Sequence, residues 1–496
     1  MKAKNILMLV AVVACLTATA QTKTTPEGEM LKNMEYRSKG MVPDYTTGQI
    51  SRFDQKDVVA HVVRNGNKFY IQDPISHYKV GMWMEGDLSA DGTQVVFHTP
   101  QVFTQEQGVT YYLYRMVPSG TSLKVDPTAT DLVFSYADGA LTQTDGGYLS
   151  ITNVEGRTTS YVEYGISITP KTETVVIPPA DATRQSYKMS YESQGSPKSK
   201  TVDVAFSGSD VYIANPTGAA DSWIHGTIEG DKLVCPNNQY LGADESLGYF
   251  VYLKAAEGSI EMVTIPGFGD FPVNNIKLVN ADAIEFDWNA ADRSFSTSQL
   301  FLVNPGNDQL GQQFYDYDKA AFTTYTEVAA TPADPTIISW TGIVEGFGFG
   351  LFAIDMPNQD TEGNFINQDN MYYNVYLDDK ILQSPAGAFD IPYTYSDGQF
   401  IQVKGTTHTF MSYNDITDRI GVQVFYKVGD QTNHSELIWY DIKNAAVAAT
   451  EARKTVQRVD CFDAQGRRVA PGTKGLVVRQ TTYTDGSKQT VKQFVK

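Results

Sequence analysis

The chain contains two segments whose short motifs follow one another in the same order. Residues 69–74 read Phe-Tyr-Ile-Gln-Asp-Pro, and residues 211–216 read Val-Tyr-Ile-Ala-Asn-Pro. Further matches are Trp83 and Gly86 with Trp223 and Gly226, and Leu132, Phe134 and Tyr136 with Ile284, Phe286 and Trp288. The separation of the matched residues varies from pair to pair, as expected when insertions fall in loops between homologous strands. The sequence therefore predicts a duplicated module.

Short alternating runs of apolar and polar residues fill both copies. Turn dipeptides such as Asn65-Gly66, Asp91-Gly92 and Asp138-Gly139 separate these runs, and such dipeptides favour tight hairpins. Aromatic residues make up 12% of the chain and charged residues only 19%, a balance that suits half-buried strands. We expect an all-β protein with antiparallel barrels or sandwiches at residues 57–178 and 184–331.

Three further segments surround the two copies. Residues 21–56 form a polar N-terminal segment, with a short helix predicted over residues 30–36. Residues 336–442 contain about seven strand-like runs, which fit a sandwich of the immunoglobulin or fibronectin type III kind. Residues 456–496 form a small β tail.

The first 20 residues have the features of a secretory signal peptide. Lys2 and Lys4 precede an apolar run too short to span a bilayer, and Ala18 and Ala20 suit signal cleavage. The alternative is a lipoprotein in which Cys15 carries the lipid anchor. Cleavage after Ala20 removes two lysines and leaves a net charge of −20, which argues against nucleic-acid partners. The sequence predicts no transmembrane segment in the mature chain.

The tail carries a recognisable pattern. It contains Asp460-Cys461-Phe462-Asp463-Ala464-Gln465-Gly466-Arg467-Arg468-Val469, then Gly475-Leu476-Val477-Val478 and a last strand rich in lysine. This pattern resembles the C-terminal sorting domain of the type IX secretion system, although Phe462 and Val477 stand where that family usually has Tyr and the first strand of the usual domain is not evident. The alternative is a small terminal β unit that docks on its neighbour. The resemblance implies interaction with the secretion machinery and display on the outer-membrane surface of a Gram-negative bacterium.

The body resembles tandem β modules of uncharacterised secreted bacterial surface proteins. The resemblance rests on residues 210–213, on Trp223-Ile224-His225-Gly226-Thr227 and on Gln239-Tyr240-Leu241-Gly242. It implies no particular activity.

No catalytic motif stands out. The sequence has no His-Glu-x-x-His motif and no Gly-x-Ser-x-Gly elbow, so we assign no catalytic residues. A glycoside hydrolase needs only two facing carboxylates, however, and sequence alone does not pair them.

Aromatic residues give the better indication of a ligand. Sugars stack their apolar faces on Trp and Tyr, and Trp83, Trp223, Tyr240 and Tyr249 lie near amides and acids in sequence. The alternative is that Trp83 and Trp223 plug the core of each module, because they occupy the same place in both copies.

Residues 358–369 resemble the oxygen-ligand spacing of a calcium-binding loop. Asn358, Asp360, Glu362 and Asp369 stand at positions one, three, five and twelve, with Gly363 at six. The alternative is an acidic connection between strands. No other cofactor is predicted.

Together these patterns predict a secreted or cell-surface protein that binds or adheres to an extracellular glycan or protein without catalysis. The alternatives are an extracellular polysaccharide-acting enzyme and a purely structural surface component.

Overall fold

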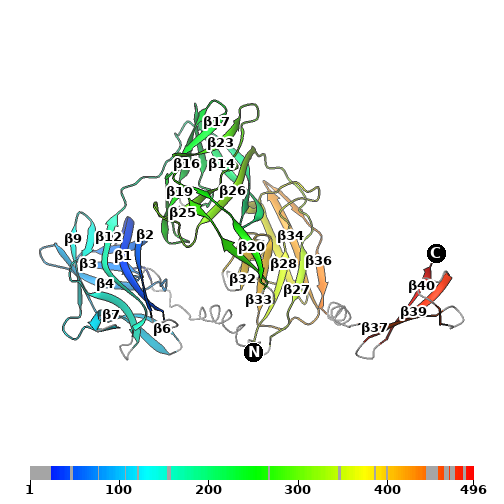
Figure 1. Cartoon of the computed structure of the whole chain (residues 1–496), viewed down its shortest axis with the longest axis horizontal. Coiled ribbons are helices and arrows are strands. Elements are labelled where there is room, and N and C mark those ends of the chain that lie inside the picture. The colour runs from blue at the N-terminus through cyan, green and yellow to red at the C-terminus, as the bar shows by residue number, and fades with distance from the viewer. Residues whose placement is uncertain are drawn as a thin grey trace. The chain divides into compact units, whose positions relative to one another are not determined.

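The computed structural model of the protein describes residues 24–495 except 45–48, 76–77, 107, 120–121, 154–157, 220, 266–268, 345–347, 385–386, 398–399, 443–455, 463–467, 470–474 and 484–487. The predicted signal peptide, with Cys15, lies outside these residues. The described residues form strands joined by turns, which confirms the predicted all-β class. The chain divides into two compact units, Met1–Tyr325 and Thr326–Lys496, whose strands are labelled in Figure 1.

Eight strands of the first unit close into an antiparallel barrel. In order around the barrel they are β1 (Glu29–Asp44), β2 (Gln49–Asn65), β3 (Lys68–Gln72), β4 (Trp83–Leu88), β5 (Gln94–His98), β9 (Asp131–Ala137), β10 (Ala140–Gln143) and β12 (Thr158–Pro170). The barrel closes because Met34 of β1 pairs with Ala60 of β2 on one side and with Pro170 of β12 on the other. Strands β6 (Gln101–Glu106), β7 (Val109–Ser119), β8 (Ser122–Val125) and β11 (Tyr148–Asn153) form a side sheet attached to β12.

A second barrel in the same unit follows the same pairing order. Its strands are β13 (Thr183–Ser193), β14 (Ser196–Ser207), β15 (Asp210–Ala214), β16 (Trp223–Glu229), β17 (Lys232–Pro236), β23 (Ala283–Asn289), β24 (Ser294–Ser296) and β26 (Tyr315–Thr324). Its side sheet contains β18 (Tyr240–Asp244), β19 (Tyr249–Glu257), β22 (Lys277–Leu278) and β25 (Phe301–Pro305). The hairpin of β20 (Ile260–Ile265) and β21 (Gly269–Asn274) is an insertion relative to the first barrel.

The residues matched in sequence take matching places in the two barrels. Phe69 lies opposite Gly86, as Val211 lies opposite Gly226. A β-carbon on Gly86 would come within 2.7 Å of the Phe97 ring, and one on Gly226 within 2.6 Å of the Cys235 sulfur. Each glycine therefore makes room for a buried side chain from the neighbouring strand. Each barrel also has its own hydrophobic core.

The first barrel begins earlier than the sequence predicts. The segment 21–56 was expected to precede the module and to hold a helix over residues 30–36, and that helix prediction is wrong. Tyr36 and Ser38 are buried while Arg37 and Lys39 are exposed, and this two-residue alternation fits a strand. Strand β1 also supplies the edge that β2 and β12 need to close the barrel.

The second unit contains a two-sheet sandwich. One sheet has the order β27 (Thr336–Trp340), β28 (Gly350–Asp355), β33 (Thr407–Ser412), β32 (Ile401–Lys404), and the other has β30 (Lys380–Ile381), β29 (Met371–Leu377), β34 (Arg419–Val428), β35 (Gln431–His434). Strands β31 (Ile391–Pro392) and β36 (Ile438–Asp441) pair with β29 and β34. Lettered in chain order, these sheets are A-B-E-D and C′-C-F-G, which is the immunoglobulin-like arrangement that the sequence predicts.

The tail forms a separate four-stranded antiparallel sheet in the order β38 (Arg468–Val469), β37 (Val456–Phe462), β39 (Gly475–Tyr483), β40 (Lys488–Val495). Within the described ranges, no helix has both the length and the apolar character needed to cross a bilayer.

Candidate functional site

The side sheet of the second barrel meets the first barrel along β2. Tyr249 of β19 pairs with Val58 of β2, and the Val59 N–H donates a 3.0 Å hydrogen bond to the Gly248 carbonyl. Lys56 also forms an ion pair with Asp308. The two barrels therefore share backbone as well as side-chain contacts.

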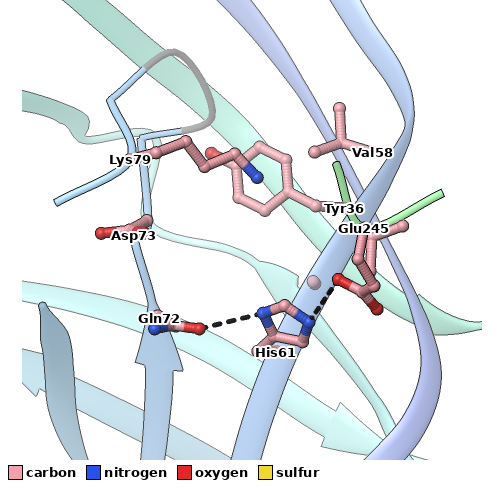
Figure 2. A pocket seen from close by; sticks show the side chains of 9 residues that line it. Tyr36, Val58, His61, Gln72, Asp73, Lys79 and Glu245 are labelled. Atoms are coloured by element: carbon pink, nitrogen blue, oxygen red, sulfur yellow. Dashed lines mark hydrogen bonds and ion pairs between the residues drawn. The ribbon is translucent and has the colours of Figure 1, made fainter. Parts of the chain in front are cut away.

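A cavity of about 130 Å³ lies at this junction. Its lining is Tyr36, Val58, Val59, Ala60, His61, Gln72, Asp73 and Lys79 from the first barrel and Glu245 from the second. Figure 2 shows the His61 ring between Gln72 and Glu245. His61 Nδ1 lies 2.9 Å from Gln72 Oε1, and Nε2 lies 3.0 Å from Glu245 Oε2. The imidazole thus connects the two barrels across one side of the cavity.

Asp73 and Lys79 line the same cavity with opposite charges (Figure 2). Burial raises the pKa of the Asp73 carboxyl above its usual value, although N–H donation from Val80 and Met82 offsets part of that effect. No residue in the described ranges forms an ion pair with Lys79, whose charge acts on Asp73. The cavity therefore offers two carboxyl groups, of Asp73 and Glu245, and the Lys79 ammonium to a ligand, while both ring nitrogens of His61 already have partners.

Asp73 also has a structural role in the turn that follows β3, where its carboxylate accepts backbone N–H groups. In the second barrel Asn215 takes the same place, where its side-chain oxygen accepts from the Thr217 N–H at 3.1 Å. A polar acceptor at this position therefore serves the turn in both barrels. Only the first barrel gives it an ionisable group.

A buried ionic cluster lies beside the same junction. Lys171 Nζ lies 2.9 Å from Asp57, 3.3 Å from Glu35 and 3.2 Å from Glu173. Aromatic rings of the second barrel lie over this ammonium: Nζ is 5.3 Å from the ring centroid of Phe250 and 5.5 Å from that of Tyr252. We call Lys171, Glu35, Asp57 and Glu173 the lysine cage.

The charges of the cage influence one another strongly. Burial lowers the pKa of Lys171, but hydrogen bonds with Tyr252 and Asp57 outweigh burial and raise it above its usual value. Burial acts to raise the pKa of Glu35, and the Arg37 hydrogen bond together with the Lys171 charge holds that pKa below its usual value. The pKa shifts of Lys171 and Glu35 therefore favour the charged forms of both groups in the cage.

Another buried carboxylate, that of Glu163, lies in β12. Glu163 is fully buried and accepts hydrogen bonds from the Ser38 hydroxyl, at 2.7 Å, and from the Tyr36 hydroxyl. Burial, together with the Glu163 charge, raises the pKa of Tyr36 well above its usual value. This pair fixes the ring of Tyr36 at the wall of the cavity.

The four aromatic residues predicted to bind a ligand do not form one surface. Tyr249 is half-buried beside the cavity, and Tyr240 is 9% exposed in the core between the barrels. Trp83 and Trp223 begin the equivalent strands β4 and β16, and Trp223 lies beneath the Arg184 guanidinium at 5.1 Å. Trp223 is 4% exposed and Trp83 is half-buried.

The predicted calcium loop is organised by its own hydrogen bonds. Asp360 Oδ1 accepts from the N–H groups of Glu362 and Asn364, and Oδ2 accepts from the Asn364 side chain. Asp369 instead lies in a 3-10 turn (η1, Gln368–Asn370) capped by Asn367. Over the described part of the chain, no group of three or more His, Cys, Asp or Glu side chains is arranged to hold a metal ion.

Sequence reasoning missed the cavity and the cage. Lys171 is 114 residues from Asp57 and 136 from Glu35, and His61 is 184 residues from Glu245. The one sequence signal was that Glu35, Asp57 and Lys171 differ from Lys188, Ser199 and Tyr325, which take their places in the second barrel. No protein-family model matches the chain, and a search of curated proteins likewise finds no match.

Proposed function

We propose that this is a secreted, cell-surface binding protein that captures an extracellular glycan without catalysis, at the junction cavity. The observation that carries the proposal is the lining of that cavity, in which Asp73 and Glu245 supply carboxyl groups and Lys79 supplies an ammonium. Sugar hydroxyls both donate and accept hydrogen bonds, so they suit such a mixed lining.

The size of the cavity limits what part of a glycan would enter. A volume of about 130 Å³ corresponds to roughly four water molecules at the density of the liquid. Complete ligand pockets in proteins are usually several times larger. We therefore propose that the end of a glycan chain enters, while the rest of the ligand stays outside.

The location of the protein at the cell surface is part of the same proposal. The N-terminal residues have the pattern of a signal peptide, and the tail resembles a type IX sorting domain. We infer that the two barrels arose by duplication and that the tail delivers them, with the sandwich, to the outer-membrane surface. Contacts between the barrels, through the Val59–Gly248 hydrogen bond and the Lys56–Asp308 ion pair, support the joint presentation of both barrels.

One observation favours glycoside hydrolysis as a second candidate. Asp73, whose pKa burial raises, shares the cavity with Glu245, and a pair of carboxyl groups carries out the reaction in many glycosidases. The backbone N–H groups that hold Asp73, and the matching Asn215, favour a structural role for this carboxyl. Binding without hydrolysis is therefore the first candidate.

A glycan array probed with residues 21–496 tests the proposal. We expect retention of a limited set of glycans by the wild type, and at least a tenfold loss of retention in Lys79→Ala. The matched control is Lys232→Ala, which removes an exposed lysine that pairs with Asp287 on the second barrel. Release of reducing ends from a retained glycan, abolished by Glu245→Gln, would favour the enzyme. Failure to retain any glycan would refute the proposal and favour a structural component.

A further inference from the structure

The lysine cage places an amine against a carboxyl group, with both side chains largely buried. Lys171 Nζ lies 2.9 Å from Asp57 Oδ1, and the exposed fractions of these side chains are 6% and 7%. Glu35, with 5% of its side chain exposed, lies 3.3 Å from the same ammonium. Aromatic rings of the second barrel, Phe250 and Tyr252, close the other side.

The cage also joins separate strands of the first barrel. Asp57 lies in β2, Glu35 in β1, and Lys171 directly follows β12. Strand β1 pairs with both of its neighbours, so a bond between Lys171 and Asp57 would span β1 at the place where the barrel closes.

Burying an ammonium and a carboxylate costs free energy that their attraction repays only in part. An amide made from the two groups carries no charge and removes that cost. The protein has no second described cysteine near Cys235, which is a free thiol in the core of the second barrel, so disulfides among the described residues do not staple this unit.

We propose that Lys171 and Asp57 become joined by an intramolecular isopeptide bond. Glu35 takes a proton from the Lys171 ammonium against the pKa shifts of both groups, so the reaction is slow, and the neutral Nζ attacks the carboxyl carbon of Asp57. The new C–N bond forms as one C–O bond breaks, and the departing oxygen leaves as water with two of the three ammonium protons. Glu35 relays these protons and ends unchanged, so the reaction needs no oxidant and no co-reactant.

The remaining carboxylates keep donors after the reaction. Glu35 still accepts from Arg37 Nε at 2.8 Å and from the Asp57 N–H at 3.0 Å. Glu173 still accepts from the Tyr252 hydroxyl at 2.8 Å. The cage therefore loses one cation and one anion without leaving a buried charge unpartnered.

The second barrel provides an internal comparison. By the strand registers, Lys188, Ser199 and Tyr325 stand at the places of Glu35, Asp57 and Lys171. None of these positions pairs an amine with a carboxyl group. We therefore expect one isopeptide bond in the first unit and no counterpart in the second barrel.

Mass spectrometry of residues 21–496 under denaturing conditions tests the proposal. The wild type is expected to weigh one water less than its sequence, and proteolysis is expected to give a branched peptide that joins Lys171 to Asp57. Lys171→Arg keeps the cation but is expected to have the full sequence mass. The matched control Lys254→Arg changes another buried lysine, in β19, and is expected to keep the loss of water.

The role of Glu35 has its own readout. Glu35→Gln is expected to fold, as judged by hydrogen exchange of the barrel strands, and to remain at the full sequence mass for much longer than the wild type. Cross-linking of this variant at the wild-type rate would overturn the assignment of Glu35. A wild type that keeps its full mass after prolonged incubation would overturn the bond itself. A mass loss without the branched peptide would also overturn it, since an aspartyl succinimide loses one water too.

Discussion

Replacing Phe286 by Ala should destabilise the second barrel more than Phe134→Ala destabilises the first. The two rings occupy matching places, opposite Leu233 and Val95, and are 3% and 0% exposed. Removing a buried Phe side chain costs about 3–5 kcal/mol. Phe286 packs against three rings, of Phe295, Phe301 and Phe322, whereas among the described residues one ring, of Phe97, packs against Phe134. Two additional aromatic pairs at about 0.5–1.5 kcal/mol each make the Phe286 variant worse by about 1–3 kcal/mol.

Hydrogen exchange followed by mass spectrometry assigns this loss to one barrel. Because about 1.4 kcal/mol corresponds to a tenfold change in an equilibrium constant, we expect exchange in β23 to accelerate at least a hundredfold in Phe286→Ala. Exchange in β9 should change little in the same variant, since each barrel has its own core. Val102→Ala, at a position 46% exposed, is the control. Equal acceleration in both barrels, or a smaller effect than that of Phe134→Ala, would refute this reasoning.

Three further predictions concern the sandwich and the tail. Burial lowers the pKa of His408 to about 4. As the pH falls, the unfolded chain therefore takes up a proton at this residue before the folded sandwich does. The sandwich should lose roughly 3 kcal/mol of stability as the pH falls from above 6.5 to about 4. His408→Phe should abolish this pH dependence in hydrogen exchange of β33, and a dependence that persists would contradict the assignment. Deletion of residues 456–496 should leave the barrels folded and prevent surface display; surface labelling of intact cells at normal levels would make the tail a structural element. Because N–H donors already occupy the Asp360 carboxylate, millimolar calcium should not raise the melting temperature of the protein, and a rise that Asp360→Ala removes would restore the calcium site.

The sequence was informative wherever a structural requirement is local. Tyr70 and Tyr212 could be matched because each stands between an alternating apolar run and a turn, and Gly86 and Gly226 because a buried side chain packs against each of them. Alternation and turn dipeptides therefore predicted the all-β class. Strand β1 was missed because two of its buried residues, Glu35 and Ser38, are polar and belong to buried hydrogen-bond networks.

The candidate site was largely beyond reach of the sequence. His61 and Glu245 meet only because the side sheet of one barrel adds to the wall of the other. The predicted sugar-stacking residues included Tyr249, whose neighbour Val58 lines the cavity, but also Trp83 and Trp223, which take matching positions in the two barrels. Residues that contact each other across a junction leave no local pattern, and residues matched between two copies identify the fold rather than the site.

Isothermal titration calorimetry tests the central claim most directly. Residues 21–496 should be titrated with the glycan that the array ranks first, beside Lys79→Ala and the control Lys232→Ala. The account predicts one binding site per chain in the wild type and the control, a dissociation constant at least tenfold weaker in Lys79→Ala, and recovery of the glycan unchanged. Equal affinity in all three proteins would place binding outside the junction cavity, and recovery of a shortened glycan would show that the protein is an enzyme.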